Sequence, residues 1–174
     1  MRKTLNLAAM VAAFGIAGSA VAQSTSQSDL YPYGITLRGG VAVPLDRNLT
    51  NVASALANIG VEYDLRTPLL KNGETYLTFD YFFKGFGGAG GGTVLPVMIN
   101  QRMYTSETTY RSYFFFGVGF AFINVNGNGT ALAARGGVGQ ELGPRTIAEI
   151  AAIISDRAGG ARATAITFNI GYRF

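Results

Sequence analysis

The sequence predicts an all-β protein, a closed eight-stranded antiparallel up-and-down transmembrane β-barrel preceded by a cleaved signal peptide. Three observations support this fold class. Apolar side chains recur at every second position in eight successive runs, which is the period of a β-strand and not of a helix. Only 14% of the residues are charged, against about 25% in an average soluble domain. The first 22 residues have the three-part layout of a secretory signal peptide.

The predicted signal peptide covers residues 1–22. Arg2 and Lys3 give it a positive start, and a mostly apolar stretch follows. Small side chains stand at the first and third positions before the cleavage point, which is set by Ala20, Ala22 and Gln23. The apolar stretch is shorter than the roughly 20 residues of a spanning helix, which disfavours a membrane anchor that stays attached. We expect a polar tail at residues 23–33 and the barrel at residues 34–174.

The composition excludes several classes of chemistry. The chain has no Cys and no His, which removes disulfides, thiolate chemistry and every Ser-His or Cys-His catalytic pair. We therefore expect a non-enzymatic protein without a cofactor. Loss of the signal would leave 12 basic and 10 acidic residues, a balance that gives no electrostatic footprint for nucleic acid.

The eight runs are expected to form the strands in chain order. They cover residues 35–43, 59–66, 76–84, 95–102, 111–122, 132–142, 147–154 and 166–174. The fifth is the clearest, because four phenylalanines alternate with glycine, alanine and tyrosine, and the sixth is the weakest. A tilted spanning strand needs roughly 9–11 residues, so eight strands fit the chain, ten remain an alternative and sixteen do not fit.

The charged residues of the runs are predicted to face the lumen. All of them fall opposite the apolar set: Arg38, Glu62, Asp64, Arg66, Asp80, Lys84, Arg102, Arg111, Arg135, Glu141, Glu149 and Arg173. Their face also carries many glycines and alanines, which suits a narrow interior. A lipid-facing Arg or Lys at mid-membrane would cost about 2–4 kcal/mol. The apolar face should therefore point outward to lipid, with the ions inside.

Two local features qualify the strand pattern. Residues 51–59 could form a short helix in the first connection, with Thr50 as its cap. Pro96 interrupts the fourth run, and a closed barrel has no free edge to accommodate its missing N–H. We therefore expect Pro96 at the outer rim or at a bulge, with regular pairing from about Val97.

The chain ends on alternating apolar residues and a terminal aromatic, namely Phe168, Ile170, Tyr172 and Phe174. With the signal peptide and the eight runs, this ending resembles the small eight-stranded outer-membrane barrels of bacteria, the family of the OmpA transmembrane domain, OmpX and the opacity-type proteins. The resemblance implies that these four residues form the signal read by the barrel-assembly machinery. It further implies a bacterial outer-membrane location, with both termini periplasmic and the connections after odd-numbered strands outside. We expect no peptidoglycan-binding domain after Phe174.

The chain departs from that family in having no Trp. An interfacial aromatic girdle must then come from Tyr and Phe. The candidate tyrosines are Tyr31, Tyr33, Tyr63, Tyr81, Tyr104, Tyr110 and Tyr172.

The lumen charges have two interpretations. The first is a structural network of salt bridges filling an interior just wide enough for side chains. The second is a gated ion path or a small-solute site. A Ca²⁺ site at Glu62, Asp64 and Asp80 is disfavoured because Arg66 and Lys84 lie close in sequence and would pair with them.

Candidate surface contacts lie in the outer connections. Phe86 is expected at the tip of a glycine-rich loop, residues 85–92, that lacks the features of a phosphate-binding loop. Arg157 and Arg162 flank the last outer turn. Arginines there could contact the phosphates of a surface glycolipid.

We therefore expect a monomer in contact with outer-membrane lipid, with a role in envelope integrity or surface contact. The alternatives are a narrow channel or binding barrel for a small ionic or apolar molecule, and a soluble exported barrel with an apolar pocket.

Overall fold

The computed structural model describes residues 33–66, 69–70, 73–87, 91–105 and 110–174. The predicted signal peptide, its cleavage residues Ala20, Ala22 and Gln23, and all but the last residue of the predicted tail lie outside these ranges. Among the described residues, no helix has both the length and the apolar character needed to cross a membrane.

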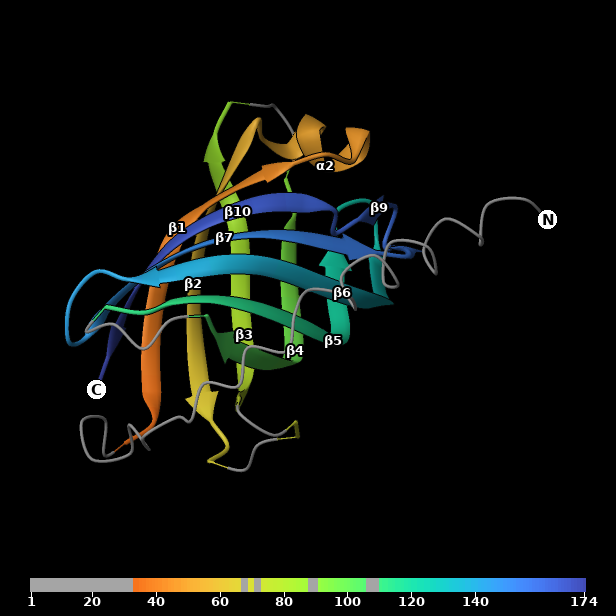
Figure 1. Ribbon diagram of the computed structural model, residues 1–174. Helices are drawn as coiled ribbons and strands as arrows, with labels where there is room; N and C mark the ends of the chain where they lie inside the picture. The colour runs from red at the N-terminus through yellow and green to blue at the C-terminus, as the bar shows by residue number, and fades with distance from the viewer. Residues whose placement is uncertain (1–32, 67–68, 71–72, 88–90, 106–109) are drawn as a thin grey trace.

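Eight long strands close into one antiparallel barrel, as predicted (Figure 1). Each strand pairs with its neighbours in the chain, and β1 pairs with β10 to close the wall. The eight strands are β1 (Ile35–Pro44), β2 (Ala55–Asp64), β3 (Glu74–Phe86), β4 (Thr93–Tyr104), β5 (Ser112–Asn124), β6 (Asn128–Glu141), β7 (Thr146–Ser155) and β10 (Ala165–Arg173). Three short elements, α2 (Arg47–Val52), β8 (Arg157–Ala158) and β9 (Ala161–Arg162), lie in connections.

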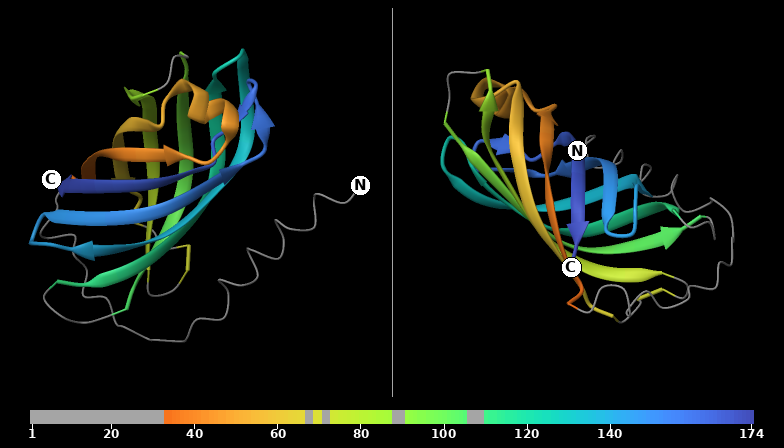
Figure 2. Two further views of the ribbon diagram at one scale, coloured as in Figure 1. Left: turned by 90° about the horizontal axis from the view of Figure 1, so that it is seen from above. Right: turned by 90° about the vertical axis from the view of Figure 1, so that its left-hand side faces the viewer.

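The barrel has two unlike ends. The C-terminus and the connections after β2, β4 and β6 lie at one end, called here the terminal end. The connections after β1, β3, β5 and β7 lie at the other, the loop end. Figure 2 shows the strands curving round to close the wall, with α2 at the end away from the C-terminus. The connection after β5 is residues 125–127 alone, because β5 and β6 both extend beyond the runs predicted at 111–122 and 132–142.

Alternation along each strand separates two faces of the wall, and the apolar face points outward. Phe116 is 43% exposed and Phe120 is 52% exposed, whereas Tyr113 and Ala121, at the alternate positions of the same strand, point inward and are buried. Val118, Leu132 and Ile170 are more than 60% exposed. The predicted inversion of faces is therefore confirmed in the fold.

The first connection corrects the helix predicted at residues 51–59. The helix is α2, which begins earlier because Asp46 caps it: its carboxylate accepts from the backbone N–H of Asn48 at 3.0 Å and of Leu49 at 3.3 Å. Thr50 lies inside the helix and does not cap it. From Ala55 onward the chain is already β2, paired with β3 on one side and, from Leu56, with β1 on the other.

Pro96 also differs from its prediction. It lies within β4, buried and paired opposite Ala121 of β5, and not at the rim. On its other side the β3–β4 pairing stops at Phe79 opposite Val97 and resumes at Phe82 opposite Val94. Because the register is the same on both sides of this gap, there is no bulge. The ladder simply lacks its bonds where the proline has no N–H to donate.

The barrel interior has two layers. The loop-end layer is an apolar core closed by α2, whose Leu49 and Val52 are buried, and it includes Phe82, Met98, Ile123 and Ile153 from four strands. The terminal-end layer holds the buried charges. The sequence pattern put Phe82, Met98 and Ile153 on the inner face, but it assigned no face to Ile123, Leu49 and Val52 and did not predict a separate core.

Candidate functional site: the charged interior and the loop end

Six buried charges form a central cluster. Three arginines, Arg38, Arg102 and Arg135, come from β1, β4 and β6, and three carboxylates, Glu62, Asp80 and Glu149, come from β2, β3 and β7. All occupy inward positions of the alternation, so the strands themselves direct them to the barrel axis. The equal numbers of positive and negative charges make the cluster formally neutral.

Arg38 is the centre of this cluster. Its Nη2 donates to both oxygens of Asp80, at 2.6 and 2.7 Å, and its Nη1 donates to Glu149 at 2.9 Å. Asp80 also accepts from Arg135 Nη1 at 3.0 Å. The Arg38 side chain is 0% exposed, so the attraction is little screened by water.

Arg102 joins the other carboxylates. Its Nη2 donates to Glu62 at 2.9 and 3.0 Å and to Glu149 at 3.3 Å. Its guanidinium carbon lies 4.4 Å from the ring centre of Tyr76 and 4.7 Å from that of Tyr113. The aromatic rings thus pack against the cation where no carboxylate reaches it.

A second cluster lies at the terminal end of the interior. Glu141 accepts from Arg173 at 2.8 Å and from Arg111 at 3.3 Å. The Tyr104 hydroxyl donates to Glu74 at 2.9 Å and accepts from Arg173 at 3.4 Å. Because Glu74 also accepts from Arg102 at 3.4 Å, the two clusters form one connected network.

Not every predicted lumen charge belongs to this network. Asp64 is half-buried at the end of β2 and accepts from the backbone N–H of Arg66. Arg66 and Lys84 are exposed near opposite ends of the barrel, so their predicted place inside the lumen is wrong. Arg66 and Lys84 both follow the inward positions of their predicted runs, but they lie beyond the part of the strand where the barrel wall encloses a side chain.

Four residues that matter to the network were not singled out as lumen residues from the sequence. Glu74 lay in a predicted connection, although it is the first residue of β3. Tyr76 and Tyr113 stood at inward positions, but their contacts with Arg102 were not foreseen. Tyr104 was assigned to an outer girdle and is instead buried, which the continued alternation of β4 from Arg102 would have indicated.

The other girdle tyrosines within the described residues are outward and 40–70% exposed: Tyr33, Tyr63, Tyr81, Tyr110 and Tyr172. Tyr31 lies outside the described residues.

The interior offers little chemistry beyond ion pairing. Both Glu62 and Asp80 are engaged by arginines rather than grouped with Asp64, and the described residues contain no cluster of three carboxylates able to hold a metal ion. An ion crossing the barrel would have to break the network and then pass the apolar core at the loop end. The arrangement therefore favours a sealed structural interior over a conducting one.

The predicted assembly signal lies along the outer face of β10. Phe168, Ile170, Tyr172 and Phe174 are all exposed there, at 39–62%. The rings of Tyr172 and Phe174 meet edge to face at 5.0 Å, and the Phe174 N–H donates to the carbonyl of Ile35 at 2.9 Å. The end of the chain is thus held in the barrel seam, with its side chain turned outward.

The candidate surface residues lie at the loop end. Phe86 ends β3 and is 75% exposed. Arg157 and Arg162 stand opposite each other in the short β8–β9 hairpin, and both are exposed.

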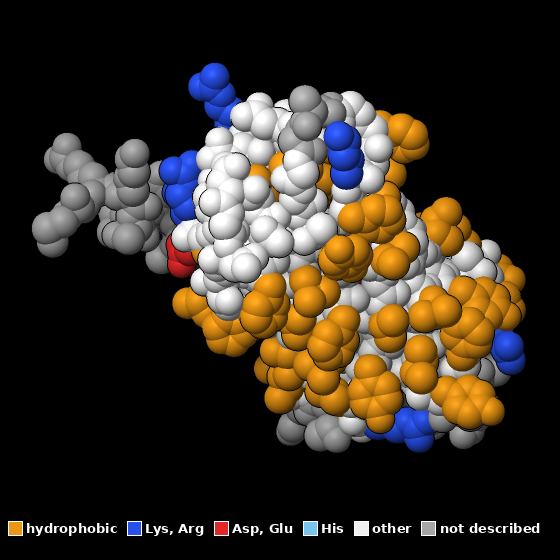
Figure 3. Space-filling model, turned by 180° about the vertical axis from the view of Figure 1, so that it is seen from behind, with side chains coloured by type: hydrophobic (Ala, Val, Ile, Leu, Met, Phe, Trp, Pro, Cys, Tyr) orange, Lys and Arg blue, Asp and Glu red, His pale blue; other side chains and the backbone are white. Residues whose placement is uncertain are grey.

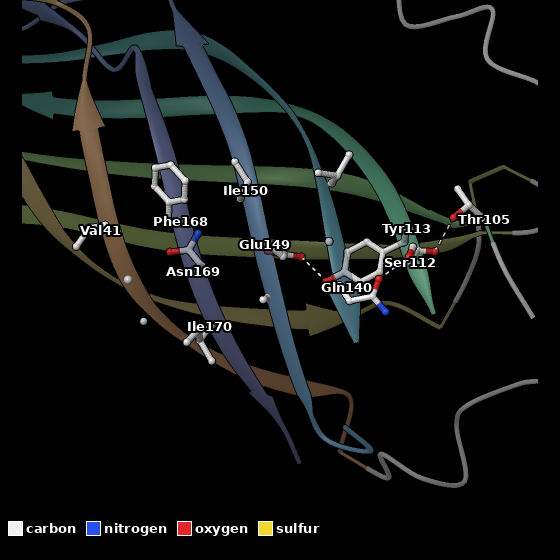
Figure 4. A pocket seen from close by; sticks show the side chains of 15 residues that line it. Val41, Thr105, Ser112, Tyr113, Gln140, Glu149, Ile150, Phe168, Asn169 and Ile170 are labelled. Atoms are coloured by element: carbon white, nitrogen blue, oxygen red, sulfur yellow. Dashed lines mark hydrogen bonds between the residues drawn. The ribbon is translucent and has the colours of Figure 1, made fainter. Parts of the chain in front are cut away.

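A shallow groove crosses the outer wall from β1 to β5 (Figure 4). Its apolar lining includes Val41, Ile150, Phe168 and Ile170. Its end near β5 is polar, because Ser112 donates to Gln140 there. The groove is continuous with the apolar outer face and contains no pair of nucleophile and base.

Comparison with known proteins supports the fold. No protein-family model matches the chain, and no curated protein matches it significantly. Among solved structures, Neisserial surface protein A has a TM-score of 0.54 at 8% identity, covering 81% of this chain and 97% of its own. Ail of Yersinia pestis has a TM-score of 0.54 at 12% sequence identity, and the match covers 80% of this chain and 98% of Ail. The N-terminal β-barrel domain of Pseudomonas aeruginosa OprF has a TM-score of 0.52 at 12% sequence identity, and the match covers 81% of this chain and 98% of that domain. The chain has the fold of the small eight-stranded outer-membrane barrels.

Proposed function

We propose that this chain is a monomeric integral protein of the bacterial outer membrane, without enzymatic activity, that contributes to envelope integrity and surface contact. One observation carries the proposal: the outer wall is apolar and exposed while the ions are enclosed. Figure 3 shows hydrophobic side chains gathered over the wall, with Lys and Arg side chains toward its ends. In water such a surface would be a large aggregation hazard, whereas lipid stabilises it.

The wall is apolar around its circumference. Every strand turns apolar side chains outward, with one example from each being Leu37, Val61, Phe79, Val97, Phe120, Leu132, Ile150 and Ile170. No Asp, Glu, Lys or Arg of the strands interrupts this face in the middle of the wall. A soluble exported barrel would show the opposite arrangement, with its apolar residues enclosed.

Absence of enzymatic activity is proposed from the residues. The chain offers no His or Cys as base or nucleophile. Within the described residues, the carboxylates of the central cluster are each engaged by an arginine, which leaves none of them free as a general base.

Membrane integration is tested by washing cell membranes with alkaline carbonate and then separating inner from outer membrane by density. The proposal expects the chain to stay in the outer-membrane fraction. Release into the supernatant would contradict it.

Orientation is tested with single cysteines, which the chain otherwise lacks. Asn126→Cys lies in the connection after β5, and Gly143→Cys lies in the connection after β6. We expect a membrane-impermeant maleimide to label Asn126→Cys on intact cells and Gly143→Cys only after the outer membrane is permeabilised. The reverse pattern would place the termini outside.

Conductance in planar bilayers separates the sealed barrel from a narrow channel. The ion network and the apolar core at the loop end support an expectation of no discrete openings. Reproducible openings at low voltage would favour the channel instead.

Biogenesis through the barrel-assembly machinery is part of the proposal. It is supported by the outward row Phe168, Ile170, Tyr172 and Phe174 on the last strand.

A further inference from the structure

The β8–β9 hairpin extends the wall at the loop end and has two distinct faces. Ala158 and Ala161 form one cross-strand pair: Ala161 is fully buried in the apolar core, and Ala158 packs against that core. Arg157 and Arg162 form the next pair. Because successive residues of a strand point to opposite faces, the two arginines point away from the barrel axis. Both are exposed.

This arginine pair is not compensated by the protein. Like charges directly opposite each other on paired strands are destabilising. In the interior, each buried arginine has a carboxylate partner. Among the described residues, neither Arg157 nor Arg162 forms a salt bridge, and the exposed neighbour Asp156 pairs with neither.

A third arginine lies at the same corner of the barrel. Helix α2 contacts β9, and Asn48 of α2 donates to the carbonyl of Gly160 in the hairpin turn at 2.6 Å. The residue before it, Arg47, is exposed. The nearby carboxylate of Asp46 is already used to cap α2. The corner therefore carries an excess of positive charge that an anion would neutralise.

The position of the two arginines along the barrel axis, relative to the apolar outer face, indicates where that anion lies. Ile154, on the outer face of β7, is three residues before Arg157, or about 10 Å along an extended chain. The arginines thus stand just beyond the apolar face and point sideways from it, at the level of lipid headgroups. Guanidinium groups bind phosphate through paired, charge-assisted hydrogen bonds.

We propose that Arg157 and Arg162, with Arg47 beside them, bind a phosphate group of an anionic glycolipid in the outer leaflet. This inference rests on the proposed outer-membrane location. It adds to it the ligand class and the geometry of the site.

The test uses the folded full barrel in phosphatidylcholine nanodiscs that contain either phosphorylated lipid A or the same lipid with its phosphates removed. Bound lipid is counted by native mass spectrometry. We expect the wild type to prefer the phosphorylated lipid by about tenfold or more, the scale of one to two charge-assisted hydrogen bonds. The variant R157Q/R162Q should lose that preference. The matched control R145Q removes an exposed arginine at the terminal end and should keep it.

A second readout guards against misfolding. In phosphatidylcholine alone, R157Q/R162Q should unfold at the same or a higher urea concentration than the wild type, because the repulsion between the two arginines is gone. A preference retained by the double variant, or absent from the wild type, overturns the inference.

Inorganic phosphate provides the last arm. If millimolar inorganic phosphate displaces the bound phosphorylated lipid as effectively as added lipid does, the site belongs to a soluble anion. That result would overturn the lipid assignment. A barrel that does not insert into the nanodisc at all would instead contradict the proposed membrane location.

Discussion

The central cluster allows a quantitative test through Arg38→Met. Arg38 is fully enclosed and holds both Asp80 and Glu149 at 2.6–2.9 Å. Methionine fills similar space but leaves two arginines against three carboxylates. Removing one partner of a buried ion pair costs about 3–5 kcal/mol, because the remaining charge stays desolvated. Typical domains are stable by about 5–15 kcal/mol, so the variant should fold but unfold at clearly lower urea.

Neutralising a carboxylate as well should restore part of the loss. In Arg38→Met/Asp80→Asn the cluster again has equal numbers of charges, two of each. We expect recovery of about 1–3 kcal/mol relative to the additive sum, the range of coupling between contacting residues. The exposed Arg145→Met should change stability by less than about 0.5 kcal/mol.

Unfolding is followed in lipid vesicles by the mobility of unheated samples on a denaturing gel, where folded barrels migrate apart from unfolded chains. A single variant within about 1 kcal/mol of the wild type would refute the claim that removing Arg38 leaves one buried negative charge in excess in the cluster. So would a double variant less stable than the single one.

Three further predictions test the wall, the interior and the chain end. Phe120→Arg places a cation on the exposed apolar face, at a cost of about 2–4 kcal/mol, and should lower the folded fraction in vesicles far more than Arg145→Ala; equal folding of the two would contradict the assigned faces. In Gly139→Val, a Cβ would lie 2.2 Å from the Tyr113 ring, and overpacking should destabilise the barrel by about 1–3 kcal/mol in the urea assay, unlike Gly143→Val, which has open space. Deleting Phe174 should reduce the assembled outer-membrane level without changing synthesis, measured by pulse-labelling; an unchanged level would mean that the ending is not read.

The sequence predicted the wall well because its signal is repeated. A strand has a period of two, so each charge such as Glu62 or Glu149 reports the phase of its whole run. Eight runs with consistent phase then leave one closed arrangement in which the ions are enclosed.

The position of a residue along the barrel axis was less predictable, because alternation shows which face of the wall a side chain is on but not how far along the axis it lies. Met98 and Ile153 were placed on the inner face correctly, yet only the closed structure brings them together with α2 as an apolar core. The helix itself was misplaced because Ala55 and Leu56 are good helix formers, whereas pairing with β3 and, at Leu56, with β1 outweighs their propensity. The capping signal at Asp46 was the better guide.

The ion pairs themselves depend on register between strands distant in sequence. Arg38 and Glu149 are 111 residues apart, and no local pattern predicts that they meet. The like-charge pair of Arg157 and Arg162 also follows from the hairpin register.

The most direct test of the account is which solvent touches the outer wall. In lipid nanodiscs with methyl-labelled protein, nuclear Overhauser contacts with acyl-chain methylenes should appear at Val118, Leu132 and Ile170, with none to water. The buried methyls of Ile123 and Ile153 should show no acyl contacts. Water contacts at the first three residues, with acyl chains absent, would contradict the claim that this barrel faces lipid.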